Sequence, residues 1–305
     1  MNVKSQFSIK DLEHLSGVKA HTIRIWEKRY NLLKPQRNDT NIRTYNLESL
    51  KRLLNVTFLY NDGLKISKIA LLSEEAIHGL VKERAIESKE KYAINAFKTS
   101  MYELDEQLFS ETYSVLSSEM SFREIFLTVF IPLLMEIGAL WQTSAIRPSH
   151  ESFISELLKR KILLNIESEA LNVKSTEKPI FVLFLPYKEV HELGILYTNY
   201  EILKAGYKTI YLGVNTPLSS LEGLLETNNK VIYVSYLTMH PEGKDIYQYI
   251  DIFENTINKT SSSNFWLLGK KSEIVDLDKI PSNINIIQGF TELIEQLKKM
   301  KSTTY

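Results

Sequence analysis

Residues 180–194 read IFVLFLPYKEVHELG. The run Ile180–Leu185 carries no charge, which is typical of a short strand buried on both faces. Four more apolar runs follow, at Thr209–Leu212, Val231–Tyr236, Phe265–Leu268 and Ile284–Ile287. Helical patterns separate the runs, near 190–205, 217–227, 241–258 and 291–301. Strands that alternate with helices predict a doubly wound parallel sheet of the flavodoxin-like type over residues 178–305.

The loop after the first strand carries the strongest motif, Glu189-Val190-His191-Glu192-Leu193-Gly194. Ligands of doubly wound sheets bind at the carboxyl ends of the strands. A neutral imidazole is a good metal ligand, and a carboxylate two residues away can accept its other N–H and fix the tautomer. Gly194 would let the following helix lie close to a bulky ligand. The alternative for His191, taken alone, is an ordinary surface histidine.

Residues 76–173 contain almost no Gly or Pro and show helical periodicity. The pattern predicts four helices, near 76–99, 102–118, 121–141 and 149–172, which would form a four-helix bundle. The most apolar stretch, from Ile125 to Met135, is too short to span a bilayer, and Pro132 and Glu136 are expected to interrupt or end it.

Residues 1–75 are expected to form a separate basic domain. They hold 13 Lys/Arg and 8 Asp/Glu, a net charge of +5, although the whole chain has 37 of each and a net charge of zero. Ser8 with Asp11 predicts a capped helix that ends near Gly17, and a second helix should run from about Ala20 to Arg29. Two short helices joined by a glycine turn indicate a helix-turn-helix, which places the second helix in the major groove of DNA.

Two residues near the start of that second helix are candidates for base contacts. Arg24 can pair with guanine edges, and Thr22 can meet a thymine methyl group or a phosphate. The following loop or small hairpin carries Lys34, Arg37, Arg43 and Tyr45, which we expect to hold phosphates. The alternative is a surface helix with solvated charges.

Composition excludes several classes of function. The chain has no cysteine, so disulfides, Cys-ligated metals and a cysteine nucleophile are absent. The N-terminus lacks the apolar core of a secretory signal, and no common catalytic or phosphate-loop motif occurs. We therefore expect a cytoplasmic protein that is not an enzyme.

The stretch at residues 22–35, TIRIWEKRYNLLKP, resembles the winged-helix head of the MerR family of transcription regulators. Arg43-Thr44-Tyr45 resembles the end of the family's wing, although Asn41-Ile42 stand where Gly is common. The resemblance covers residues 7–72. It implies binding to pseudo-palindromic, double-stranded promoter DNA as a dimer.

The order Glu-x-His-x-x-Gly at 189–194 resembles the Asp-x-His-x-x-Gly signature of cobalamin-binding domains. Those domains continue with Ser-x-Leu and Gly-Gly, which correspond here to Ser235-Tyr236-Leu237 and Gly269-Lys270. The resemblance implies that His191 binds cobalt, that Glu189 orients it, and that Ser235, Leu237 and Gly269 lie at the nucleotide tail of adenosylcobalamin or methylcobalamin. Glu in place of Asp adds a methylene, which predicts a longer or re-aimed hydrogen bond. The missing second Gly predicts a tighter or altered tail pocket.

The order of DNA head, helical bundle and cobalamin fold resembles the light-responsive, cobalamin-dependent repressors of carotenoid genes. In those repressors a bundle Trp is followed, after nine residues, by Glu-His. Here Trp141 is followed by Glu151-Ser152, so the Glu matches and the His does not. Trp141 and Glu151 are therefore candidates for packing against the upper axial ligand of cobalt, the alternative for Trp141 being a core aromatic.

Three hypotheses for function follow. The first is a regulator, self-associated as a dimer or tetramer, in which bound cobalamin controls assembly and operator binding. The second is a regulator with a degenerate sensor domain that needs no cobalamin and serves protein–protein contact; Gln142, where light sensors often have a His, favours it, as do Ser152 and Lys270. The third is a corrinoid carrier for a methyltransferase, which the DNA-binding head disfavours.

Overall fold

The computed structural model describes residues 6–37, 42–85, 89–142, 145–173, 179–223, 230–239, 241, 245–258 and 263–302. It divides into two compact units, 1–157 and 158–305, with the division inside the long helix α10 (Pro148–Ala170). The three sequence domains, 1–75, 76–173 and 178–305, stay a prediction.

The first unit begins with the expected helix-turn-helix. Helix α1 (Ile9–Ser16) starts at a capping box in which Ser8 and Asp11 exchange hydrogen bonds, and it ends at Gly17, whose φ of 73° is left-handed. Helix α2 (Ala20–Tyr30) follows and buries Ile23 and Trp26. The next segment is a hairpin of β1 (Gln36–Arg37) and β2 (Arg43–Thr44), followed by α3 (Leu47–Asn61) and α4 (Ile66–Ile69). Asn41, at the position where Gly is common, lies outside the described residues.

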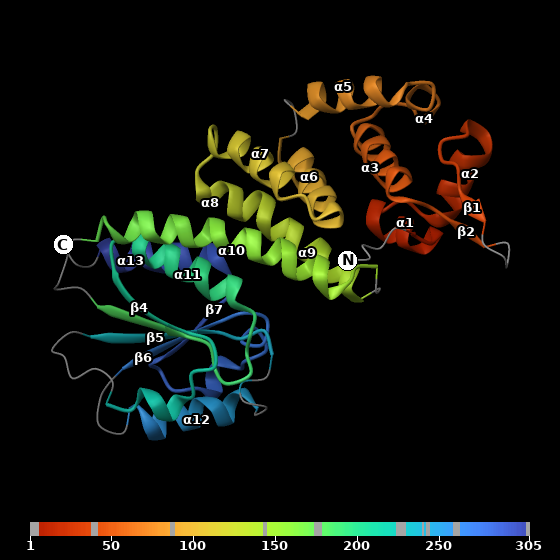
Figure 1. Cartoon of the computed structure of the whole chain (residues 1–305). Helices are drawn as coiled ribbons and strands as arrows, with labels where there is room; N and C mark the ends of the chain where they lie inside the picture. Colours follow the sequence, from red (N-terminus) through yellow and green to blue (C-terminus); the bar gives the residue numbers. More distant parts are fainter. Residues whose placement is uncertain are drawn as a thin grey trace. The chain divides into compact units, whose positions relative to one another are not determined.

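The helical region matches the sequence prediction except at its start. The helix expected over 76–99 is two helices, α5 (Glu74–Ala85) and α6 (Lys89–Glu103). No Gly or Pro marks the junction, which is why the periodicity predicted one helix. The other helices are α7 (Glu106–Ser117), α8 (Phe122–Ile125), α9 (Ile131–Gln142) and α10 (Figure 1).

Helices α8 and α9 are joined by η1 (Phe126–Phe130), a π-helical segment, so the chain stays helical past Pro132. The helix predicted over 121–141 is therefore present, and it contains Pro132. A proline in the first turn of a new α-helix has no hydrogen bond to lose, and the wider π turn precedes it. The stretch Phe122–Trp141 has the length and the mean hydropathy, 1.8, of a membrane-crossing helix, and 39% of it is buried. Phe126, Phe130 and Ile137 are among its buried side chains, as in the core helix of a bundle.

The second unit contains the predicted five-stranded parallel sheet. Its strands are β3 (Ile180–Phe184), β4 (Lys208–Gly213), β5 (Val231–Tyr236), β6 (Asn264–Leu268) and β7 (Ile284–Ile287), in the order β4-β3-β5-β6-β7. Helices α11 (Glu192–Lys204) and α13 (Phe290–Ser302) cover one face, and α12 (Ile246–Thr256) covers the other (Figure 1). Two short 3-10 helices, η2 (Leu218–Leu221) and η4 (Leu277–Lys279), lie in the connections. The reversal of strand order between β3 and β5 places the β3–α11 loop at the carboxyl edge, where such folds bind ligands.

Candidate functional site

Helix α2 presents the predicted base-contacting residues at its first turns. Arg24 is exposed and Thr22 is partly exposed, whereas Ile23 and Trp26 face the core. This division arises because a helix with 3.6 residues per turn puts residues 23 and 26 on one face. Contact of Thr22 and Arg24 with DNA stays a prediction.

The hairpin is tied to α2 by Glu27, a residue that the sequence reasoning did not single out. Its carboxylate accepts a hydrogen bond from Arg43 Nε at 3.0 Å and from the Tyr45 hydroxyl at 2.9 Å. Burial and the hydrogen bond to Glu27 raise the pKa of Tyr45. Glu27 is the single acidic residue in the basic stretch RIWEKR, and this feature of the sequence could have indicated its role as an ion-pair partner.

The contacts with Glu27 bear on the phosphate contacts predicted for the hairpin, which stay a prediction. Tyr45 is buried, and its hydroxyl donates a hydrogen bond to the Glu27 carboxylate. This hydrogen bond joins the residue after β2 to helix α2. Arg43 is partly exposed but ion-paired, while Lys34 and Arg37 are exposed and stay candidates for phosphate contact.

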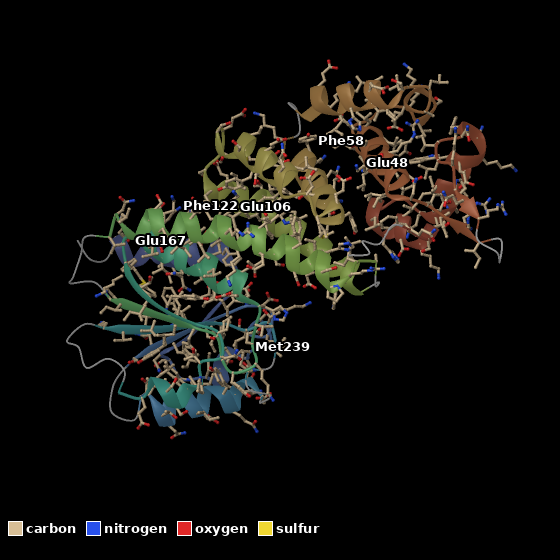
Figure 2. All side chains as sticks on the ribbon, in the orientation of Figure 1. Glu48, Phe58, Glu106, Phe122, Glu167 and Met239 are labelled. Carbon is tan, nitrogen blue, oxygen red and sulfur yellow. The ribbon has the colours of Figure 1, made fainter. Side chains whose placement is uncertain are left out.

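In the sheet unit, Glu189 is the centre of a dense hydrogen-bond network. One carboxylate oxygen, Oε1, accepts from the backbone N–H of Val190 and His191 and contacts His191 Nδ1 at 2.5 Å. The other, Oε2, accepts from the backbone N–H of Thr238 at 2.9 Å and of Met239 at 2.8 Å; Met239 is labelled in Figure 2. Glu189 thus ties the loop after β3 to the loop after β5.

The same network sets the protonation of Glu189. Its side chain is only 3% exposed, and this burial opposes ionisation. The hydrogen bonds from His191 and from the backbone of Met239 outweigh the burial and lower the pKa of Glu189 to about 2. A permanently ionised carboxylate favours the His191 tautomer with its proton on Nδ1.

His191 is the N-cap residue of α11, and its side chain is half exposed. With Nδ1 directed at Glu189, Nε2 is the ring nitrogen available in this tautomer for a metal. The extra methylene of Glu does not lengthen the contact as expected. The second carboxylate oxygen also reaches the backbone donors after β5.

Ser235, Leu237 and Gly269 lie at the carboxyl ends of β5 and β6. Ser235 is fully buried, and its Oγ has no hydrogen-bond partner among the described residues. Gly269 has a φ of 94°, and a Cβ there would lie 2.6 Å from the carbonyl oxygen of Leu237. Gly269 is thus required by the packing of two backbone segments, a structural reason that needs no ligand.

The environment of Gly194 differs from the expectation. A Cβ at this position would lie 2.6 Å from Cε1 and Cζ of Tyr236. The space that sequence reasoning assigned to a bulky ligand therefore holds an aromatic ring of the protein itself. Tyr236 is the unspecified residue of the Ser-x-Leu motif. Its large side chain is the feature of the sequence that could have indicated this packing.

The bundle residues predicted for the upper side of a corrinoid lie near one chain reversal. Trp141, near the end of α9, is 46% exposed, so it is not a core aromatic. Glu151 lies partly exposed in the first turn of α10. His150 is buried against the Tyr102 ring, and its Nδ1 accepts from the Arg147 N–H at 3.3 Å.

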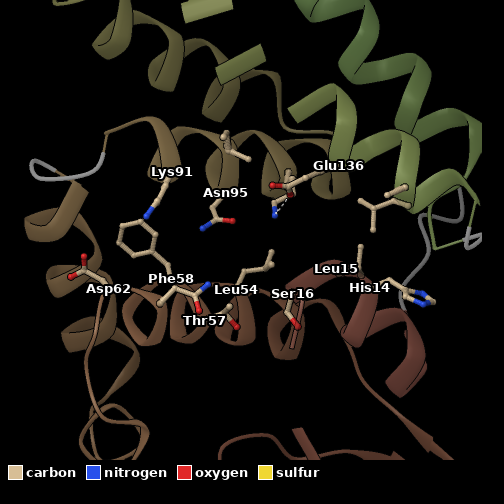
Figure 3. Close-up of a pocket in the computed structure, with 16 residues that line it drawn as sticks. His14, Leu15, Ser16, Leu54, Thr57, Phe58, Asp62, Lys91, Asn95 and Glu136 are labelled. Atoms are coloured by element: carbon tan, nitrogen blue, oxygen red, sulfur yellow. Dashed lines mark hydrogen bonds and ion pairs between the residues drawn. The ribbon is translucent and has the colours of Figure 1, made fainter. Parts of the chain in front are cut away.

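The first unit also contains a cavity of about 390 Å³ between α1, α3, α6 and α9 (Figure 3). Its wall includes the Lys98–Glu136 ion pair and Thr57. Thr57 is buried, and its hydroxyl has no hydrogen-bond partner within the described part of the chain. None of the residues predicted to contact DNA or cobalamin lines this cavity.

Comparison with known proteins agrees with both predicted modules. Residues 7–76 match the family model described as MerR HTH family regulatory protein, and residues 93–164 match the model described as B12 binding domain. The first match covers the helix-turn-helix, and the second covers helices α6 to α10 and lies outside the sheet. The chain therefore combines a MerR-type helix-turn-helix with a helical region similar to a B12 binding domain.

Within that class, the chain is homologous to two repressors of Myxococcus xanthus. It is 23% identical over 222 residues to the HTH-type transcriptional repressor CarH, covering 70% of this chain and 73% of CarH. It is 24% identical over 233 residues to the HTH-type transcriptional repressor CarA, covering 75% of this chain and 76% of CarA. The fold resembles the monomethylamine corrinoid protein of Methanosarcina barkeri, with a TM-score of 0.54 and 12% identity over 67% of this chain and 96% of that one.

Proposed function

We propose that this chain is a cytoplasmic transcription repressor whose sheet domain binds a corrinoid through His191. The observation that carries the proposal is the geometry of Glu189 and His191, a half-exposed imidazole oriented by a buried, ionised carboxylate at the ligand edge of the sheet. A MerR-type head and a B12-binding domain in one chain, and homology to two named repressors, support the regulatory part.

The residues on the metal side fit a corrinoid. His191 would hold the cobalt from below, and Glu189 would fix its tautomer and ring orientation. When bound, the corrinoid supplies a cobalt centre with an exchangeable upper axial group, adenosyl or methyl. Trp141 is exposed as a packing surface for such a group requires, and Glu151 offers a carboxylate. The buried Ser235 hydroxyl is a polar group that a ligand could satisfy.

On the DNA side, Thr22 and Arg24 would contact bases and Arg37 would contact a phosphate of double-stranded promoter DNA. Glu27 would hold the hairpin in position through Arg43 and Tyr45. A ligand changes DNA affinity only if it binds one state of the protein better than another. We take that state to be the assembly, as a dimer or tetramer.

The test is a visible spectrum of the full chain after mixing with adenosylcobalamin in the dark and desalting. Wild type and the control His14→Ala, a histidine outside the site, should retain the colour, and His191→Ala should lose it or show a spectrum without histidine ligation. Light-scattering mass and binding to a DNA fragment selected by the protein should then change together when corrinoid is added.

A colourless wild-type protein would refute the corrinoid part and favour a ligand-independent regulator. The packing of Tyr236 on Gly194 is the observation in favour of that second function. A mass and a DNA affinity that both stay constant in the presence of bound corrinoid would refute the coupling.

A further inference from the structure

The ring of Tyr236 lies directly on the first turn of α11. The three nearest atoms to a Cβ built on Gly194 are ring atoms of Tyr236, at 2.6, 2.6 and 2.8 Å. Real Cβ atoms do not approach other atoms so closely, so Gly194 allows this ring to pack. Packing of the Tyr236 ring, rather than close approach of a ligand, thus accounts for a glycine at position 194.

Tyr236 is held from a second side by α13. Its ring stacks on Phe290 with centroids 6.0 Å apart and planes 18° from parallel. Phe290 in turn packs edge-on against Tyr197 of α11, with centroids 4.8 Å apart. The ring is therefore a packed part of the face covered by α11 and α13, and moving it breaks aromatic contacts.

The Tyr236 ring packs on the turn of α11 that follows His191. His191 caps α11, and Gly194 follows three residues later, about 4.5 Å along the helix axis. A corrinoid held by His191 would lie against this turn, with its cobalt bound by the imidazole in place of the nucleotide base. The displaced nucleotide needs space beside α11, and the Tyr236 ring fills the space at Gly194.

We propose that Tyr236 is a specificity-determining residue that makes this chain prefer corrinoids with a truncated tail, of the cobinamide class, over complete cobalamins. This inference rests on the proposed function, because it assumes that His191 binds a corrinoid. A complete cobalamin has to displace the ring and lose its stacking, whereas cobinamide, which lacks the nucleotide, leaves the ring in place.

The experiment is a spectrophotometric titration of the full chain with aquacobinamide and with hydroxocobalamin. Wild type should bind cobinamide about tenfold more tightly, the factor expected from one lost aromatic contact. Tyr236→Ser should abolish the preference by raising affinity for hydroxocobalamin, while Tyr236→Phe keeps the ring and should keep the preference. Tyr187→Ser, which changes an exposed tyrosine of the loop after β3, is the matched control and should behave as wild type.

If Tyr236→Ser does not fold, Phe290→Leu provides the second test, since it removes the stacking partner and should reduce the preference. Equal wild-type affinity for the two corrinoids, or a preference unchanged in the folded variants, would overturn the inference and leave the proposed function intact. Binding of neither corrinoid by wild type or by any variant would refute the proposed function, and this inference with it.

Discussion

Replacement of Glu189 by Gln tests whether this carboxylate organises the ligand edge of the sheet. Glu189 accepts hydrogen bonds from five N–H groups, three at Oε1 and two at Oε2. A glutamine has one acceptor oxygen, so its NH₂ group would face at least two donors. We expect the loop after β3 to separate from Thr238 and Met239.

Two estimates, both of which rest on the hydrogen bonds of Glu189, give the size of the effect. A fall in the pKa of Glu189 from the ordinary 4.5 to about 2 corresponds to about 3 kcal/mol of stability at neutral pH. The loss of two hydrogen bonds to a charged acceptor, at about 1.5–3 kcal/mol each, gives about 3–6 kcal/mol. Both point to a loss near 3 kcal/mol in the free energy of unfolding of the sheet unit.

The pH dependence follows from the lowered pKa. The stabilisation is fully present at pH 7, above the unfolded-state pKa near 4.5, and it is lost as the pH falls toward about 2. The difference in the free energy of unfolding between wild type and Glu189→Gln should therefore be about half as large at pH 3 as at pH 7.

The assay is hydrogen exchange of the corrinoid-free full chain in increasing urea, followed by mass spectrometry of β3 and β5 peptides. The exposed Glu222→Gln, at the end of η2, is the control and should change stability by less than about 0.5 kcal/mol. A loss below about 1 kcal/mol for Glu189→Gln at pH 7, or one that is the same at pH 3, would refute the reasoning.

Four further predictions concern the first unit. Arg24→Ala should weaken binding to a selected DNA duplex by about 1–3 kcal/mol and relax sequence preference at one position, whereas Arg37→Ala should lower the salt slope of binding by about 1, both measured by fluorescence anisotropy. Glu27→Gln should cost about 1–3 kcal/mol in urea unfolding and weaken DNA binding, because it breaks the ion pair with Arg43; unchanged DNA affinity would count against the hairpin's role. Thr57→Val should raise the free energy of unfolding by about 1 kcal/mol, since it removes a buried hydroxyl without a partner, and a loss of stability would show that water fills the cavity of Figure 3.

The sheet could be predicted from the sequence because its signals are local. Each strand is a continuous apolar run, and each run in the structure lies within about one residue of its prediction. The helix pair α1–α2 could be predicted equally well, since its capping box and its left-handed Gly17 depend on residues that are close together in the sequence. The division between α5 and α6 could not be predicted, because the helical periodicity of the sequence continues from one helix into the next.

The candidate sites show a similar limit. The pairing of Glu189 with His191 spans two residues and could be predicted, but the bonds from Glu189 to Thr238 and Met239 span 49 and 50 residues. Likewise, the burial of Tyr45 depends on Glu27, 18 residues earlier. Such contacts are set by how distant segments pack, which residue spacing along the chain does not encode.

The arrangement around His191 constrains how a bound corrinoid could alter the protein. Glu189 joins the imidazole of His191 to the loops after β3 and β5, so this proposed metal ligand is held in one orientation. Tyr236 is different, because its ring connects Gly194 on α11 to Phe290 at the start of α13. A ligand that displaces the ring changes the packing of α13, so tail size should determine whether the sheet unit itself responds.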